Sequence, residues 1–530
     1  MDRRPAPARH ALARLFGLAA LAATLIAGAM TPTRAQDQAK SNTNATLIYF
    51  DAVGNLTLDP REPQNNSSFA QGPMMALYDA LIYLTPKGEP SPGLAESWKY
   101  NADLTELTLK LRPGVTFHDG SKLDASVVAK NFEKASALGT RAGFATSEAM
   151  GAITGVETKG DDIVILKLKA PNGQMPFLLG AQPGMMIAAA SLDADGFGAT
   201  LKPVGTGPYK VRSFESNVRT VMDRYDGYWG GTAGRPAAIE HHFVPDGRAR
   251  LNAVRSGQSN LSIIDARTIT EAKQAGMDVL INEKNSTWDF YLNVKRTNIG
   301  NLKVRQAFMH ALDRQAIADA LGFGASQPTA QLFSKSSPVY DPALDQLYPY
   351  DPDKAKKLLA EGGYPNGVDI TWLLLNTTEY KLIAEAVQAM MAEVGIRLKF
   401  DVIDTSQFTT FRRPPTRGDI MMARWGGRPD PLQAFQEVAV SGGSVNAGDA
   451  AVPEIDVLAA KAKAMDPNSP ERMAVIKQLN RLTTEVVSHF GLMTRSQVYA
   501  YKPGCISGLP PYLPTGNDRI NDVRIAANCK

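Results

Sequence analysis

Alternating apolar and polar side chains in the first half of the chain predict β-strands. A β-prone run begins at Thr46, and from 107 to 111 three leucines alternate with threonine and lysine. Residues 163–168 form a second β-rich run. We therefore expect the first half of the chain to be rich in strands.

The pattern changes to a helical period near residue 302. Apolar side chains between 304 and 312 recur at i, i+3, i+4, i+7 and i+8, the spacing of one buried helix face. A second helix is expected after Asp351, because Asp-Pro offers an N-cap and a first-turn proline and the glycines at 362–363 can end the helix.

A βαβ unit follows. A strand at 370–375, a helix at 379–394 and a strand at 396–402 predict two parallel strands with a right-handed crossover. This unit indicates an α/β lobe over 288–495.

A further strand at 419–423 runs into a loop at 424–431 that is rich in glycine and proline. In open α/β sheets, ligands bind beyond the carboxyl ends of the strands. This loop is therefore where we first expect a ligand site.

Residues 1–35 are typical of a secretory signal peptide. Four arginines precede an apolar run from 15 to 30, which is shorter than the ~20 residues needed to span a bilayer. Small side chains at Thr33 and Ala35 predict cleavage before Gln36. We expect a soluble, periplasmic protein, and the sequence leaves open whether the general or the twin-arginine route exports it.

Removal of this segment cancels the net charge. It takes away five of the 57 Lys and Arg and one of the 53 Asp and Glu, which leaves 52 of each sign. A neutral chain gives no support to binding of nucleic acid or acidic membranes. The remaining chain, about 495 residues, exceeds what one hydrophobic core usually supports, so two or more lobes are expected.

Both cysteines, Cys505 and Cys529, lie near the C-terminus of a chain that we expect in an oxidising compartment. A disulfide that fastens the tail is the favoured interpretation, and two unpaired thiols are the alternative. Neither cysteine has a CxxC partner or a nearby histidine, which argues against a metal site.

A series of short motifs occurs in a fixed order along most of the chain. They are 78–83 (YDALIY), 92–98 (PGLAESW), 109–120 (LKLRPGVTFHDG), 123–132 (LDASVVAKNF), 204–209 (VGTGPY), 226–229 (DGYW), 304–308 (VRQAF) with Asp313, and 394–396 (VGI). Together they resemble the family 5 extracellular solute-binding proteins of ABC importers, which take up peptides, nickel chelates, opines and related solutes.

The resemblance implies a type II periplasmic-binding-protein fold of the cluster C type, in which two α/β lobes are joined by a hinge. It implies lobe I, with two subdomains, over 36–287, lobe II over 288–495, and a C-terminal return to lobe I over 496–530. Chain crossings near 288–293 and 493–498 would form the hinge. A ligand that binds between the lobes would then shift the equilibrium from the open form to the closed form.

In peptide-binding relatives, an Asp three residues after the tryptophan that matches Trp425 grips the amino group of the ligand. Arg428 stands at that position here, and Asp430 could take part of the Asp role after realignment. A guanidinium suits a carboxylate or phosphate and repels an ammonium group. We expect Arg428 to bind an acidic group of the ligand. The alternative is that it pairs with Asp430 or another carboxylate and only shapes the loop.

Three further residues complete the predicted ligand site. Trp425 offers a large apolar face and one N–H donor, with core packing as the alternative. Asn293, at the expected hinge, could bond across the cleft or could be a turn residue. Arg61 lies where the resemblance places ligand-contacting residues at the lip of lobe I, and a solvated surface arginine is the default for it.

Common motifs for catalysis or cofactor binding are missing. The sequence has no GxSxG, HExxH, GxGxxG or Walker-type pattern. His118 belongs to a turn, and His241 and His242 would point to opposite faces of a strand, so no metal site is indicated. We expect no cofactor and no enzyme activity. The alternatives are a hydrolase with scattered carboxylates and a ligand-presenting partner of a chemoreceptor.

The expected function is therefore capture of a solute by a monomeric protein that delivers it to the permease subunits of an ABC transporter. The solute is peptide-like or another small molecule, and it is acidic if Arg428 contacts it. Which of the solutes of the family is bound stays open, because specificity resides in a few cleft side chains.

Overall fold

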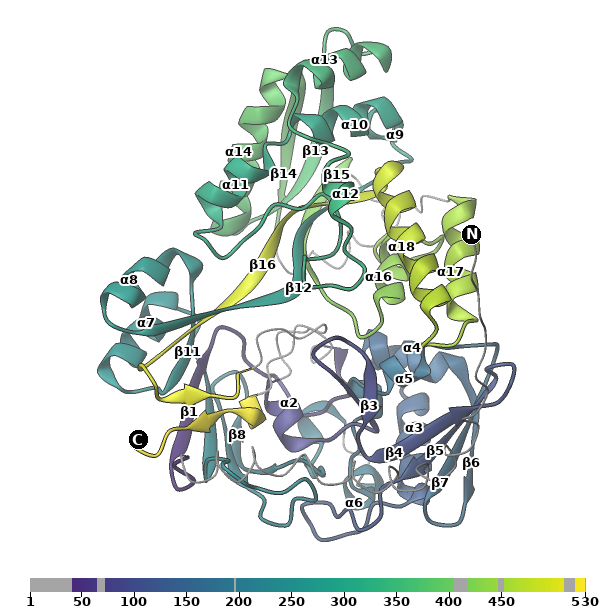
Figure 1. The fold of residues 1–530 in the computed structure, drawn as a ribbon, viewed down its shortest axis with the longest axis vertical. Helices are drawn as coiled ribbons and strands as arrows, with labels where there is room; N and C mark the ends of the chain where they lie inside the picture. The colour runs from purple at the N-terminus through teal and green to yellow at the C-terminus, as the bar shows by residue number, and fades with distance from the viewer. Residues whose placement is uncertain are drawn as a thin grey trace, which may run out of the picture.

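The protein is described by a computed structural model in which two lobes are stacked along the longest axis (Figure 1). The described residues are 41–63, 72–194, 197–404, 418–446, 452–509 and 520–529. The predicted signal peptide lies outside them. We call the lower part of Figure 1, with β1 to β11, lobe I, and the upper part, with α9 to α18, lobe II.

One ten-stranded sheet runs through both lobes. Its strands, in spatial order, are β14 (Ile396–Ile403), β13 (Val368–Leu375), β15 (Ile420–Gly426), β12 (Asp278–Leu292), β16 (His489–Tyr501), β11 (Leu261–Ile264), β1 (Thr46–Asp51), β10 (Ala238–Phe243), β9 (Arg219–Arg224) and β8 (Tyr209–Glu215). The first three belong to lobe II and the last five to lobe I. The fold is thus the predicted α/β type with two lobes.

Two long strands, β12 and β16, cross from one lobe to the other (Figure 1). They pair antiparallel from Asp278 opposite Tyr501 to Tyr291 opposite His489, and the register shifts between Glu283 and Thr287 and again between Trp288 and Asp289. At the lobe I end β16 also pairs with β11, and at the lobe II end β12 also pairs with β15. The lobes are therefore connected by a two-stranded ribbon with an irregularity near its middle.

Lobe II contains the predicted βαβ unit, with β13 and β14 parallel and α14 (Thr378–Glu393) between them. Helices α10 (Leu302–Ala311), α11 (Arg314–Leu321), α13 (Pro352–Glu361) and α14 lie on one flank, and α16 (Pro431–Val438), α17 (Pro453–Lys463) and α18 (Pro470–Glu485) lie on the other (Figure 1). The Asp351 carboxylate accepts a hydrogen bond from the Lys354 N–H at 2.9 Å, which confirms the predicted cap of α13. A single large hydrophobic core, drawn from residues between Trp288 and Met493, holds these elements together.

Lobe I has two large cores and a smaller hydrophobic cluster that includes Leu251 and Ile264. One lies against a four-stranded sheet of β4 (Ala95–Tyr100), β5 (Glu106–Leu111), β7 (Ile163–Leu168) and β6 (Ile153–Lys159), with α3 (Ala125–Ala137) and α4 (Phe144–Ala152) beside it. The other surrounds β1 and β10 and includes the tail residues Val523 and Ile525. His118 joins the two parts, since its Nδ1 accepts from the Gly205 N–H at 3.3 Å and its Nε2 bonds the Gly207 carbonyl at 2.9 Å. The turn role predicted for His118 thus extends to a contact with the 204–209 motif.

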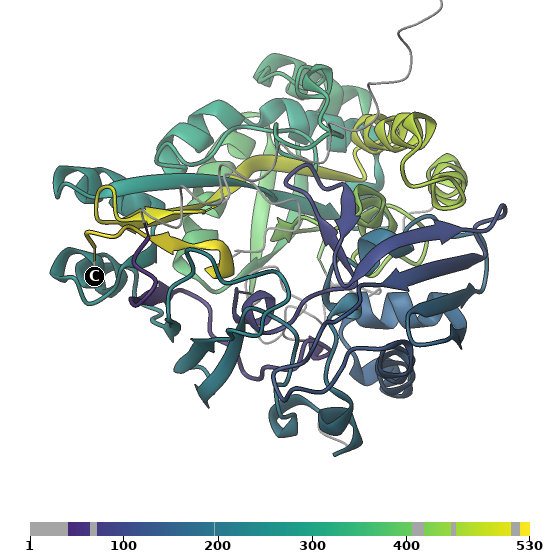
Figure 2. The same cartoon turned by 60° about the horizontal axis from the view of Figure 1, so that its bottom comes forward.

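The C-terminal tail returns to lobe I, where its two short strands β17 (Ile506–Ser507) and β18 (Arg524–Ile525) pair beside the β1 region (Figure 2). Cys505 and Cys529 are joined by a disulfide. The two cysteines therefore close a loop around this tail.

Shorter elements complete the fold. They are α2 (Gly72–Leu77), β2 (Ile82–Leu84), β3 (Pro90–Pro92), α5 (Met175–Leu178), α6 (Ala189–Asp193), α7 (Gly247–Ser256), α8 (Ile269–Gln274), α9 (Thr297–Gly300) and α12 (Pro342–Asp345). Within the described ranges, no helix combines the length and apolar character that a membrane crossing requires.

Candidate functional site

The face of β12 that lies toward Trp425 carries polar side chains. Thr287 and Asp289 are buried on this face, while Trp288 and Phe290 point to the opposite face and pack in the lobe II core. Trp425 pairs with Thr287 across the sheet and is 1% exposed. Its indole N–H has no hydrogen-bond partner among the described residues. Trp425 also belongs to the lobe II core, which is the arrangement of the core-packing alternative, and its contact with a ligand stays a prediction.

Asp289 is a buried acidic residue on the same face of β12 that the sequence analysis did not single out. Its carboxylate accepts a hydrogen bond from the Thr287 hydroxyl at 2.9 Å, and burial raises its pKa well above the usual range. The sequence signal was an acidic residue inside the apolar run 288–292, because a charged side chain is unusual in a strand that is otherwise buried.

Arg428 lies over the Trp425 ring, 4.5 Å from its centroid, and faces a carboxylate. Its Nε and Nη2 donate to the two carboxylate oxygens of Glu437 at 2.6 and 2.7 Å, and Nη1 donates to the Gly426 carbonyl at 3.0 Å. Burial opposes the charge, but Glu437 outweighs it and raises the pKa of Arg428. This is the arrangement of the alternative interpretation, with Glu437 rather than Asp430 as the partner. Contact with a ligand stays a prediction.

Asp430 is fully buried at the start of α16. Its Oδ1 accepts from the Leu432 N–H at 3.2 Å as an N-cap, and its Oδ2 pairs with Nη2 of Arg472 at 2.5 Å. Arg472 is 2% exposed and also donates to the Ala462 carbonyl. The Asp430 carboxylate is therefore engaged by a helix end and a cation from α18, and a role toward the ligand stays a prediction.

Asn293 does not lie near Trp425 in the structure. It follows β12 at the end that pairs with Ile420, whereas Trp425 lies near the other end of β15. Its backbone N–H donates to the Asp419 carbonyl at 2.9 Å, and its carbonyl accepts from the Arg296 N–H at 3.0 Å. These bonds are those of a turn residue.

Arg61 is 7% exposed in lobe I, so it differs from the solvated arginine that is the default expectation. Its Nε and Nη2 donate to the two oxygens of Asp59 at 2.9 and 2.8 Å. The Phe197 ring lies 5.5 Å from Arg61 and 5.8 Å from Arg141. The backbone carbonyl of Arg61 accepts from the Gly143 N–H, directly before α4. Arg61 therefore belongs to the part of lobe I from which α4 extends toward lobe II.

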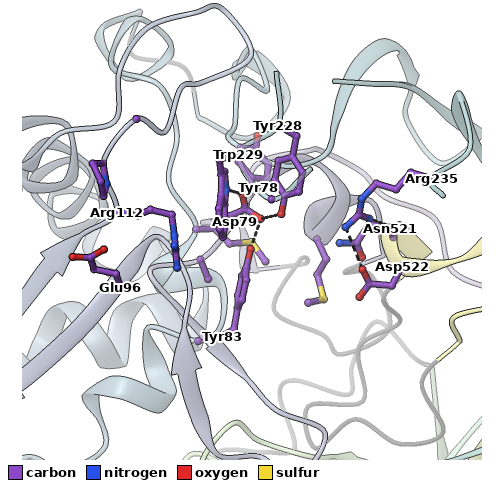
Figure 3. Close-up of a pocket in the computed structure, with 17 residues that line it drawn as sticks. Tyr78, Asp79, Tyr83, Glu96, Arg112, Tyr228, Trp229, Arg235, Asn521 and Asp522 are labelled. Atoms are coloured by element: carbon purple, nitrogen blue, oxygen red, sulfur yellow. Dashed lines mark hydrogen bonds and ion pairs between the residues drawn. The ribbon is translucent and has the colours of Figure 1, made fainter. Parts of the chain in front are cut away.

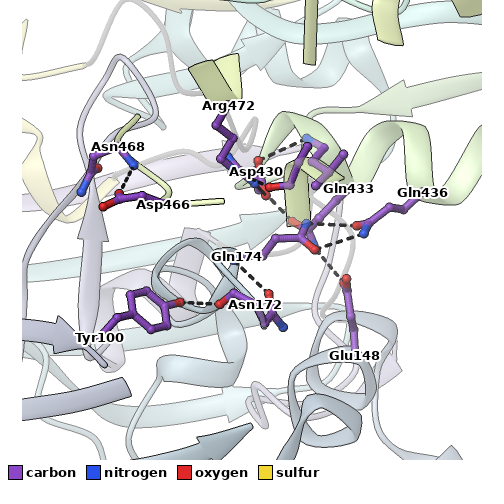
Figure 4. Close-up of polar contacts among 12 residues, drawn as sticks. Tyr100, Glu148, Asn172, Gln174, Asp430, Gln433, Gln436, Asp466, Asn468 and Arg472 are labelled. Carbon is purple, nitrogen blue, oxygen red and sulfur yellow. Dashed lines mark hydrogen bonds and ion pairs between the residues drawn. The ribbon is translucent and has the colours of Figure 1, made fainter. Parts of the chain in front are cut away.

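Side chains of the two lobes meet beside this region (Figure 4). Gln433 of α16 donates to the Glu148 carboxylate of α4 at 2.6 Å. The side-chain amides of Gln174 and Gln436 exchange hydrogen bonds of 3.0 and 3.1 Å. No sequence pattern marks these residues, because partners from different lobes meet only after folding.

Cavities open between the lobes on both sides of the contact region. One, of about 750 Å³, is lined by Glu89 and Phe177 from lobe I and by Arg428 and Met473 from lobe II. Another, of about 320 Å³, lies at the crossing strands and is lined by residues of both lobes, among them Asp51, Asp265, Trp288, Arg424 and Arg495. The described residues thus form a cleft between two lobes that the paired strands β12 and β16 join.

A third cavity, of about 690 Å³, lies inside lobe I (Figure 3). The Asp79 carboxylate faces it and accepts from the Tyr83 and Tyr228 hydroxyls and from the Trp229 indole at 2.5, 3.2 and 2.7 Å. Burial raises the pKa of Asp79 to about 6, and these hydrogen bonds oppose the rise. Arg112 lies 4.6 Å from the Trp229 ring centroid. These contacts link the motifs at 78–83, 109–120 and 226–229, so they join the two subdomains.

Metal ligands do not gather among the described residues, where no group of three His, Cys, Asp or Glu side chains could hold an ion. His241 pairs with Asp51 at 3.1 Å and His242 with Glu240 at 3.2 Å. The two histidines thus bond different carboxylates.

Comparison with known proteins gives a consistent result. The family model of bacterial extracellular solute-binding proteins, family 5, matches residues 89–447, more than half of the chain. The glutathione-binding protein GsiB of Pectobacterium atrosepticum is 28% identical over 364 residues, which are 67% of this chain and 69% of that protein.

Solved structures share the fold. NikA from Brucella suis in complex with Fe(III)-EDTA has a TM-score of 0.80 at 24% identity, covering 91% of this chain and 100% of that one. The binding protein AgaA of A. tumefaciens R10, in complex with agropinic acid, has a TM-score of 0.76 at 24% identity, covering 91% and 99%. With the two-lobed sheet, its cleft and the family match in agreement, the chain belongs to family 5 of the bacterial extracellular solute-binding proteins.

Proposed function

We propose that this protein is the periplasmic substrate-binding component of an ABC importer, which captures a small solute between its lobes and delivers it to the permease. The observation that carries the proposal is the cleft between two lobes that are joined by the crossing strands β12 and β16. A ligand that contacts both lobes stabilises the closed form, because the open form cannot make both sets of contacts.

The solute class is peptide-like or acidic. A relative named for glutathione binding and a structural neighbour in complex with agropinic acid support this class, since both compounds carry acidic groups. Arg61 and Arg428 supply guanidinium groups, each already paired with a carboxylate of the protein. An acidic group of the ligand would share such a guanidinium, and the Trp425 N–H offers an additional donor.

The two lobes that move relative to each other correspond to the ranges expected from the sequence. Lobe I comprises 36–287 with the return of 496–530, and lobe II comprises 288–495. The protein acts as an exported monomer without catalysis, which the signal-like pattern of 1–35 and the membership in a family of solute-binding proteins support.

The test is a thermal-shift screen over dipeptides, longer peptides, glutathione, opines, oligosaccharides and metal chelates. A ligand selective for the native state raises the melting temperature. The best hit is then followed by small-angle X-ray scattering and by mass spectrometry of the recovered solute. Compaction with an unchanged solute supports the proposal. A cleaved solute, or saturation without compaction, refutes it.

A further inference from the structure

Glu148 is the one acidic side chain of α4, and the groups that surround it come from lobe II. Gln433 donates to its Oε2 at 2.6 Å, Glu437, Lys463 and Asp430 are charged groups that act on it, and the Arg428 guanidinium also interacts with it electrostatically. Since this carboxyl projects from lobe I into a polar part of lobe II, separation of the lobes would return it to water.

The charges facing Glu148 do not neutralise it. Glu437 is paired with Arg428, and Asp430 is paired with Arg472, so both nearby carboxylates already have their cations. Lys463 is half-buried and attracts a negative charge at Glu148, but it forms no ion pair with it within the described residues. The partner that contacts Glu148 directly is a neutral amide.

We propose that the Glu148–Gln433 contact is a proton-dependent latch, so that the two lobes take up one proton from solvent when they close and release it when they open. The inference deepens the proposed function and rests on the opening and closing of the cleft. The amide N–H of Gln433 bonds one carboxyl oxygen of Glu148, and the proton resides on the other oxygen. The Gln174–Gln436 pair and the bond from the Gly173 N–H to the Lys463 carbonyl, at 2.7 Å, carry no titratable group and complete the latch.

The direction of the pH effect follows from the two environments. Burial raises the pKa of Glu148 from its ordinary value of 4.5 to about 7 while the lobes are in contact, and it outweighs the Gln433 hydrogen bond, which alone would lower the pKa. Opening hydrates the carboxyl and returns its pKa toward the ordinary value. Between these two values the closed form holds a proton that the open form lacks, so acid favours closure. The ratio of closed to open protein falls by up to about tenfold per pH unit as pH rises through this interval, the limit for one proton.

The experiment is small-angle scattering on the ligand-free protein at pH 5.5 and pH 8.0, which requires no knowledge of the solute. We expect the wild type to be more compact at pH 5.5. Glu148→Gln copies the neutral carboxyl, so this variant is expected to be equally compact at both values. Gln433→Ala removes the lobe II partner and is expected to be less compact than the wild type at pH 5.5.

Glu133→Gln is the matched control, because it removes one negative charge from an exposed position of α3 in the same lobe. It should keep the pH response of the wild type. A wild type with the same dimensions at both pH values, or a response that Glu148→Gln retains, overturns the latch. Either outcome leaves ligand-induced compaction, and with it the proposed function, to be judged separately.

Discussion

Three arginines, of which Arg61 and Arg472 are buried and Arg428 is half-buried, each face a carboxylate of the same lobe. Arg61 pairs with Asp59, Arg428 with Glu437, and Arg472 with Asp430. Replacing a buried ion pair by apolar groups is often neutral, whereas removing one partner leaves an uncompensated charge. Removal of one member of such a pair is therefore expected to destabilise the fold more than replacement of both members by apolar groups.

Replacement of Arg428 by Ala should destabilise the fold, whatever its effect on the ligand. Glu437 is 4% exposed at its side chain and would lose its counterion, which costs about 3–5 kcal/mol for a fully buried pair and less here, because the Arg428 side chain is 24% exposed. Urea unfolding should show a loss of about 2–3 kcal/mol. The double variant Arg428→Ala with Glu437→Gln should recover much of it. An unchanged midpoint for the single variant would contradict the pairing.

His489 should make the protein sensitive to acid. It is 2% exposed, its ring nitrogens have no partner among the described residues, and burial lowers its pKa to about 3. The unfolded chain binds this proton more tightly, with a pKa near 6.5, so stability is complete above that pH and falls as pH decreases toward 3. Between pH 7.5 and 5.0, this residue accounts for up to about 2 kcal/mol.

The variant His489→Phe keeps an aromatic ring against Tyr291, whose centroid lies 4.6 Å away. The difference in unfolding free energy between wild type and variant, measured by urea at both pH values, should grow on acidification. A difference that does not depend on pH would refute the assignment.

At the level of single residues, the sequence predicts contacts between neighbours in the chain. The Asp351 cap is visible because Asp, Pro and the following turn are adjacent in the chain. The partner of Arg428 lies nine positions away on α16, and the partner of Asp430 is Arg472, on α18. Such pairings follow from helix packing, so the chemistry of the Arg428 guanidinium is predictable from the sequence, whereas the identity of the carboxylate that pairs with it is not.

At the scale of elements, the C-terminal tail depends on its disulfide. The loop between Cys505 and Cys529 spans 24 positions, and closing a loop of this size restricts the unfolded chain by roughly 3 kcal/mol. The double variant Cys505→Ser with Cys529→Ser should therefore unfold at lower urea, with a loss of about 2–4 kcal/mol. Reductant should shift the wild type in the same direction and leave the double variant unchanged. Equal stability of oxidised and reduced wild type would contradict this role.

Regular elements were predictable where the hydrophobic period is clean. The βαβ unit from β13 to β14 appears with bounds within a few residues of the prediction, since each element has one buried face. Strand β12 was foreseen only as a crossing near 288–293. Its first part, 278–287, alternates poorly because it crosses from one lobe to the other and changes register, so its side chains do not face one continuous core.

At the scale of the whole molecule, the amide contacts between the lobes offer a way to hold the cleft shut. The side chains of Gln174 and Gln436 are hydrogen-bonded across the cleft, so a short thiol-specific cross-linker should join Gln174→Cys to Gln436→Cys. The cross-linked protein should have compact scattering at every pH and should not bind the best solute of the thermal-shift screen when that solute is added afterwards. The two single-cysteine variants treated with the same reagent are the controls. Unhindered binding by the cross-linked form would show that the solute does not enter between the lobes.

The shared ten-stranded sheet has a mechanical consequence. The ladder between β12 and β16 shifts register twice within a few residues, between Glu283 and Thr287 and between Trp288 and Asp289. Torsion can therefore concentrate between Glu283 and Asp289, where the pairing is least regular. A twisted ribbon resists further torsion, so the backbone of β12 and β16 sets a preferred angle between the lobes, and contacts across the cleft must supply the free energy that turns the lobes away from that angle.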